Sequence, residues 1–279
     1  HRARTVRRTG APMTLPAAAH PAAPRRLARS LAARSTLAFA LVLPFAVPVQ
    51  AQAPAPVAKE APAVVEVGRF SAEREGAASP AGWKPLTFRN IERQTQYALV
   101  REGGSVVLRA DADASASGLV REQTIDLKAF PIIEWRWRAG NVLAKADVKT
   151  KAGDDYPVRL YITFAHDANS ISLADRAARA IYGQLPPRAA INYIWDTRSP
   201  VGTTVPNAYT DRVRMIVVES GSARVGEWIT YRRNLAEDFR KAFGYDAPLV
   251  SGIAVMTDTD NTGEKATAWF GDIRFLAIR

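Results

Sequence analysis

Short segments in which apolar and polar side chains alternate dominate the sequence after residue 95. In Ile132–Arg138, the residues Ile133, Trp135 and Trp137 would point to one side of an extended strand, and charged residues would point to the other. Val158–Phe164 alternates in the same way. A period of two fits a β-strand with one buried face and does not fit a helix. The sequence therefore predicts a mainly β protein.

The other predicted strands are short, rich in β-branched and aromatic residues, and bounded by Gly, Pro, Asp or Asn. Gly103-Gly104 separates two of them and indicates a hairpin. Nine strands are enough for two stacked sheets, so we expect an antiparallel two-sheet β-sandwich. The remaining segments are Tyr97–Glu102, Ser105–Ala110, Ile191–Trp195, Val213–Ser220, Trp228–Arg232, Val250–Thr257 and Ala266–Ile278.

Two short helices are predicted as insertions between these strands. Ser172 and Asp175 form a capping box, and Gly183 ends the helix that follows. Asn234 caps the second helix, and Gly244 ends it. Neither helix repeats a strand–helix–strand rhythm, which argues against a doubly wound fold.

Residues 1–51 have the composition of a signal peptide with upstream residues. They contain eight arginines and no acidic residue, and the last four arginines precede the apolar run Leu37–Val49. This run is too short for a spanning helix, and small residues after it predict cleavage behind Ala51. We therefore expect a periplasmic or secreted protein without stable membrane insertion once the signal is removed.

The remaining chain predicts a linker and one domain. Residues 52–63 are rich in Pro and Ala, and a single β-sandwich domain is expected over 64–279. The formal charge of +11 falls mostly on the leader, so it is no sign of nucleic-acid binding. The chain has no cysteine, which excludes disulfides, lipid attachment at cysteine and a thiol nucleophile.

Five longer motifs carry a resemblance to a known family. They are Glu134-Trp-Arg-Trp-Arg138, Asp154-Asp-Tyr-Pro-Val-Arg-Leu-Tyr161, Asn192-Tyr-Ile-Trp195, Val218-Glu-Ser-Gly221 and Met256-Thr-Asp-Thr-Asp-Asn-Thr-Gly-Glu264. In this order they resemble a family of exported bacterial proteins classed as a domain of unknown function. The closing Gly271-Asp-Ile-Arg-Phe275 is also similar to the last strand of galactose-binding-like jelly rolls. The second resemblance implies a jelly-roll sandwich, and the first implies no activity.

Charged residues on two of the predicted strands suggest a ligand-binding patch. If the two strands are neighbours, their charged faces form one surface, where planar guanidinium groups and an aromatic platform suit a glycan or a small polar ligand. The alternative is cross-strand ion pairing on a solvated face. The residues predicted to bind a ligand are Glu134, Arg136, Arg138, Asp154, Asp155, Arg159, Tyr161 and Trp195.

The densest group of oxygen-bearing side chains lies between Asp258 and Glu264. Asp258, Asp260, Asn261 and Glu264 surround a glycine, as the ligands of a hard cation such as calcium would. The alternative is a turn in which these side chains accept hydrogen bonds from backbone amides. Calcium is therefore a possible cofactor, and no other cofactor is expected.

The residues leave three functional classes open. His166 is the only histidine after the leader, so neither an ordinary zinc site nor a supported serine triad can be assembled. We expect non-catalytic binding of a glycan or small polar ligand. The alternatives are a polysaccharide-active enzyme that uses paired carboxylates from Glu134, Asp155 and Glu219, and a module of the cell envelope that binds another protein.

Overall fold

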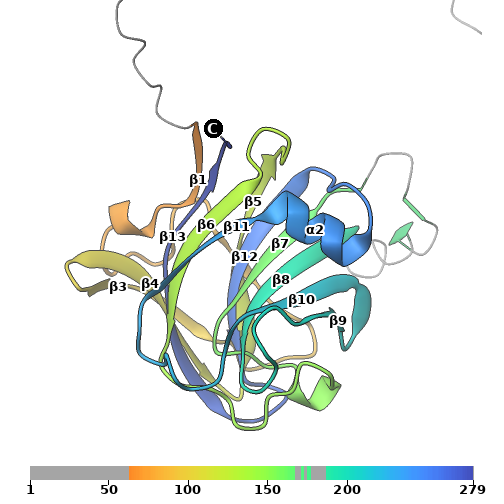
Figure 1. Ribbon diagram of the computed structural model, residues 1–279. Coiled ribbons are helices and arrows are strands. Elements are labelled where there is room, and N and C mark those ends of the chain that lie inside the picture. Colours follow the sequence, from red (N-terminus) through yellow and green to blue (C-terminus); the bar gives the residue numbers. More distant parts are fainter. Residues whose placement is uncertain (1–62, 167–170, 173–174, 177–186, 279) are drawn as a thin grey trace, which may run out of the picture. The chain divides into compact units, whose positions relative to one another are not determined.

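Two β-sheets stacked face to face make up the fold in the computed structural model (Figure 1). The structure describes residues 63–166, 171–172, 175–176 and 187–278. All of them belong to the compact unit Ala58–Arg279, and the unit His1–Val57, which holds the predicted signal peptide, lies outside the described residues. No helix within the described ranges is long and apolar enough to cross a membrane.

The six-stranded sheet has the order β11-β6-β13-β4-β3, and β1 also pairs with β13. The candidate functional site lies on the outer face of this sheet. The strands are β1 (Val64–Gly68), β3 (Gln96–Glu102), β4 (Ser105–Asp113), β6 (Ile132–Ala139), β11 (Ile229–Asn234) and β13 (Lys265–Leu276).

The seven-stranded sheet has the order β2-β5-β12-β7-β8-β10-β9. All its pairs are antiparallel except β8–β10, which run parallel. The strands are β2 (Lys84–Leu86), β5 (Ala116–Ile125), β7 (Arg159–Phe164), β8 (Ala189–Asp196), β9 (Thr204–Asn207), β10 (Thr210–Ser220) and β12 (Val250–Asp258). Both outermost strands are short and contain a proline, Pro85 in β2 and Pro206 in β9.

The core lies between the sheets, and the alternation in β6 decides which side chains enter it. Trp135 and Trp137 are 1% and 0% exposed, while the charged residues of β6 point outward. The Trp135 ring stacks on Tyr193 of the opposite sheet at 4.9 Å and on Tyr231 of β11 at 5.1 Å. The predicted β-sandwich with both tryptophans inside is therefore confirmed.

Helix α2 (Leu235–Phe243) begins and ends where the sequence predicts. The Asn234 side chain accepts a hydrogen bond from the Glu237 amide, and Gly244 ends the helix with a φ of 81°. Phe239 packs on Phe164 of β7 at 4.5 Å, which fixes the helix against the sandwich. Of the other predicted helix, the Ser172–Asp175 capping contacts are present, and most of its remaining residues lie outside the described ranges. Two 3-10 turns, η1 (Phe70–Ala72) and η2 (Lys151–Gly153), complete the fold.

Candidate functional site

The charged patch expected from the sequence is divided between two surfaces. β6 belongs to the six-stranded sheet and β7 to the seven-stranded sheet, so the expected joining of their charged faces does not occur. Glu134, Arg136 and Arg138 lie on the outer face of one sheet, and Arg159 and Tyr161 lie on the outer face of the other. Alternation fixes which face of a strand is buried, but it does not choose the sheet that the strand joins.

Tryptophan and arginine side chains alternate in a row across the outer face of the six-stranded sheet. Arg138 of β6 lies opposite Trp269 of β13, which in turn lies opposite Arg109 of β4. Trp228 immediately precedes β11, whose first residue, Ile229, pairs with Trp137. Because β11 and β6 are antiparallel, Trp228 lies beside Arg138, the residue after Trp137. We call these four residues the tryptophan–arginine row.

Cation–π contacts hold the row together. The Arg138 guanidinium lies 3.8 Å from the centre of the Trp269 ring and 5.5 Å from that of Trp228. The Arg109 guanidinium lies 5.8 Å from the Trp269 ring. Both rings are half-buried, so part of each remains open to solvent. These contacts fix the rings and the guanidinium groups in place before any ligand binds.

Carboxylates orient the arginines of the row. Arg138 donates to Glu102 at 2.9 Å, and Arg109 donates to Asp111 at 2.9 Å. Asp111 also accepts a hydrogen bond from the Thr267 hydroxyl at 2.8 Å. The row is therefore continuous with a network of hydrogen-bonding groups on β4 and β13.

A polar cavity of about 290 Å³ lies beside the row, and its lining includes Asp111, the carboxylate that binds Arg109 of the row. Carboxamides, carboxylates, a guanidinium and a hydroxyl line this cavity, and such groups bind hydroxyl-rich ligands through hydrogen bonds. The lining residues are Arg93, Gln94, Gln96, Asp111, Asp113 and Ser115.

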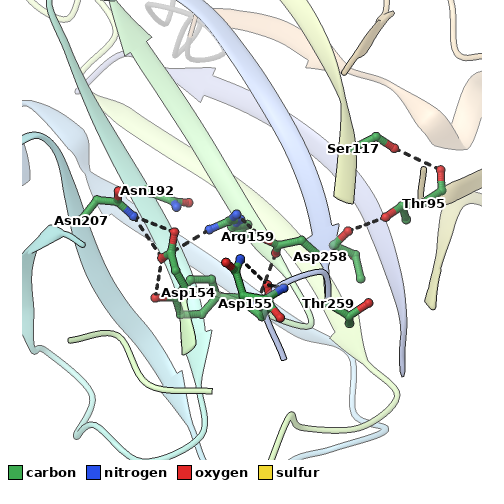
Figure 2. A network of polar contacts seen from close by, with 12 residues as sticks. Thr95, Ser117, Asp154, Asp155, Arg159, Asn192, Asn207, Asp258 and Thr259 are labelled. Atoms are coloured by element: carbon green, nitrogen blue, oxygen red, sulfur yellow. Dashed lines mark hydrogen bonds and ion pairs between the residues drawn. The ribbon is translucent and has the colours of Figure 1, made fainter. Parts of the chain in front are cut away.

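A second, buried cluster surrounds Arg159, where β7 begins and the neighbouring strand β12 ends (Figure 2). Arg159 and Asp258 have side chains that are 5% and 1% exposed, and they form an ion pair. Asp154 lies 3.9 Å from the same guanidinium and accepts two hydrogen bonds from the Asn207 amide at 3.0 Å. Asp155 accepts a hydrogen bond from the backbone amide of Thr262 at 2.7 Å. We call these residues the Arg159 cluster.

Burial raises the pKa of Asp258 well above 3.8, and the charge of Arg159 opposes the rise. The pKa of Asp260 is raised as well, chiefly by burial and then by the charge of Asp155. The Oδ1 atom of Asn192 and the Nε atom of Arg159 are buried without a hydrogen-bond partner among the described residues. The charged side chains of the Arg159 cluster are therefore poorly solvated.

The predicted calcium residues are only partly brought together. Asp258, Asp260 and a third acid, Asp155, each place one carboxylate oxygen within 4.8 Å of the oxygens of the other two. Glu264 is directed elsewhere, because its two oxygens accept hydrogen bonds from the amides of Ala144 and Lys145 at 3.0 Å. The Asn261 amide donates to Asp155 at 3.1 Å, and its oxygen accepts from Tyr209 at 2.8 Å.

Trp195, which was predicted to bind a ligand, does not form an exposed aromatic platform. Its ring is 0% exposed, and its Nε1 donates to the carbonyl of Gly221 at 2.9 Å. The part-exposed tryptophans are instead Trp228 and Trp269, which are not among the ligand-binding residues predicted above. Trp269 stands between the buried residues Ala268 and Phe270, and this alternation is the signal that marks it as outward-facing.

The carboxylates considered for catalysis belong to separate contact networks. Glu134 binds Arg274 at 2.6 Å on the outside of the six-stranded sheet. Glu219 accepts hydrogen bonds from Tyr231 at 3.1 Å and Arg224 at 3.2 Å. Asp155 belongs to the Arg159 cluster. Each of the three is thus engaged by partners of its own.

Residues 81–274 match the model of a family described as "Protein of unknown function (DUF3047)". The chain belongs to this family. No curated protein matches this DUF3047 chain in sequence. The family to which the sequence motifs pointed is therefore confirmed.

Solved structures similar to the DUF3047 chain include a carbohydrate-binding module and an endoglucanase, both at low identity. The family 30 carbohydrate-binding module of a cellulosomal cellulase from Clostridium thermocellum is 13% identical, with a TM-score of 0.38, over 76% of this chain and 98% of that one. The family GH12 endoglucanase 3 of Trichoderma harzianum is 11% identical, with a TM-score of 0.39, over 79% and 96%. Likenesses this distant carry no argument about ligand or activity.

Proposed function

We propose that this DUF3047 protein is exported and binds a glycan or a related small polar ligand, without catalysis, on the outer face of the six-stranded sheet. The observation that carries the proposal is the tryptophan–arginine row beside a polar cavity. Stacking on an indole ring and hydrogen bonds to guanidinium, amide and carboxylate groups are the interactions that a polyhydroxylated ring can use.

The shape of this surface suits an elongated ligand. The row crosses from β11 to β4, and three strand spacings of about 4.8 Å give a length of roughly 14 Å. The cavity extends the surface at the β4 end, where its lining residue Asp111 binds Arg109 of the row. Because cation–π contacts already hold the rings, a ligand would lose little affinity to the ordering of side chains.

Removal of one ring tests the proposal. Mature protein from residue 52 onward is applied to a glycan array, and the glycans that bind are titrated by calorimetry. We expect Trp269→Ala to weaken binding at least tenfold, which corresponds to about 1.4 kcal/mol. Tyr245→Ala is the matched control, because it removes another part-exposed ring, 40% exposed, beside α2. Equal affinity of Trp269→Ala and the unaltered protein would contradict the proposal.

Export has its own test. The signal-peptide pattern predicts that protein recovered from the periplasmic fraction or the medium begins at Gln52, or at Pro54 if the chain is cut one step later. N-terminal sequencing or intact mass measurement of the recovered protein decides between these ends. Membrane-bound protein with an intact leader would contradict export.

A polysaccharide-active enzyme remains the second proposal, and one observation favours it. One carboxylate oxygen from each of Asp155, Asp258 and Asp260 lies within 4.8 Å of the others, so these acids are grouped closely, as the paired carboxyls of retaining glycosidases are, at about 5–5.5 Å. Against it, Asp155 and Asp258 are buried and engaged with protein groups. Release of reducing ends from array-positive polysaccharides, lost in Asp260→Asn, would favour this alternative over pure binding.

A further inference from the structure

Among the described residues, one arginine on the outer face of the six-stranded sheet has no carboxylate partner. Arg136 of β6 points to the same side as Arg138, two residues away on the strand. Its guanidinium lies 4.8 Å from the centre of the Trp228 ring. Within the described part of the chain, it makes no ion pair or hydrogen bond, whereas Arg109 and Arg138 each bind a carboxylate.

The nearest acid on the same strand is already occupied. Glu134 binds Arg274 through two hydrogen bonds, at 2.9 and 2.6 Å, and lies 3.9 Å from Arg232. Its charge is therefore shared by two other arginines. No described carboxylate therefore compensates the charge of Arg136, which lies next to an aromatic ring on the outer face of the sheet.

The neighbouring strand is shaped to hold the Arg136 side chain. Gly271 of β13 faces it, and a methyl group added at Gly271 would overlap the Cγ and Nε atoms of Arg136. The absence of a side chain at position 271 thus lets the arginine lie flat against the backbone of β13. Held between this backbone and Trp228, the guanidinium has a defined orientation, which favours a planar acceptor with two oxygens.

We propose that Arg136 binds the carboxylate of an acidic sugar, so that the ligand of this face is a glycan containing uronic acid. This inference rests on the proposed function and names its ligand class. A carboxylate pairs with a guanidinium through two parallel hydrogen bonds, which neither a neutral hydroxymethyl group nor an ester reproduces. The row beside Arg136 supplies the rings on which neighbouring sugars stack.

The test compares acidic oligosaccharides with their own neutral forms. Hexamers of galacturonate, mannuronate, guluronate and glucuronate are titrated against the mature protein, each beside its carboxyl-reduced counterpart. At least one acid should bind ten times more tightly than its reduced form, and the preference should shrink as salt is added. Equal or tighter binding of the reduced forms would overturn the inference and leave glycan binding intact. Failure of all oligosaccharides, together with an empty glycan array, would overturn the proposed function itself.

Three variants locate the effect at Arg136. Arg136→Gln should abolish the preference for the acid, so that the acidic and reduced forms bind this variant with equal affinity. Gly271→Ala should weaken the preference as well, because it displaces the Arg136 side chain without removing charge. Arg232→Gln is the matched control, since it removes an equal charge from a neighbouring, 61% exposed side chain on the same sheet. If Arg232→Gln lowers acid binding as much as Arg136→Gln does, general electrostatic attraction explains the preference and the assignment to Arg136 is wrong.

Discussion

Replacement of Trp135 by alanine should destabilise the protein by about 4 kcal/mol. The indole is 1% exposed and lies between two tyrosine rings, Tyr193 from the opposite sheet and Tyr231 from the adjacent strand. Truncation of a buried tryptophan to alanine costs about 3–5 kcal/mol, and each lost aromatic pair contributes about 0.5–1.5 kcal/mol. The indole Nε1 has no hydrogen-bond partner among the described groups, so its removal offsets part of the loss.

The phenylalanine variant separates these effects. Trp135→Phe keeps a ring between Tyr193 and Tyr231 and removes the unpartnered N–H, so its cost should stay below about 1.5 kcal/mol. Urea unfolding followed by circular dichroism gives both free energies, with an unchanged m-value as evidence that compactness is preserved. A loss below 1 kcal/mol in Trp135→Ala would mean that the ring is not core. A loss in Trp135→Phe as large as in the alanine variant would mean that the indole N–H has a partner.

Two further predictions concern the Arg159 cluster. Millimolar calcium should leave the melting temperature unchanged, because Glu264 is held by backbone amides and Arg159 supplies positive charge at Asp258. A rise in melting temperature that is lost in Asp260→Ala would show instead that calcium binds. The raised pKa of Asp260 means that the folded protein keeps a proton that the unfolded chain releases near pH 3.8. Stability should therefore fall as the pH rises from 3.8 through the folded pKa, and Asp260→Asn should flatten this part of a plot of urea midpoint against pH.

Local sequence patterns predict the parts of this fold that local physics determines. Alternation in β6 places Trp135 inside, and Asn234 and Gly244 mark the ends of α2, because each signal depends on a few consecutive residues. The partner of each strand is a different matter. The separation of β6 and β7 into different sheets, and the parallel pairing of β8 with β10, follow from contacts between distant segments that no single strand encodes.

The candidate site illustrates the same limit. The tryptophan–arginine row combines side chains from β4, β6 and β13 with the residue before β11, and only Arg138 was selected from sequence. Asp155 joins the acidic loop from more than one hundred positions earlier in the chain, as its contact with Thr262 shows. By contrast, Glu264 fits a metal-ligand pattern in sequence, yet it binds amides of a distant loop that the pattern does not include.

The prolines in the outermost strands of the seven-stranded sheet affect how molecules of this protein meet one another. A further strand added at β2 or β9 would find no amide hydrogen at Pro85 or Pro206 and only a short stretch of backbone to pair with. Growth of that sheet from one molecule into the next is thereby discouraged, which guards against aggregation when many copies fold in a small volume. Among the described strands, the longer edges open to lateral self-association are β3 and β11 of the other sheet, whose broad outer face would still be free to take up a ligand.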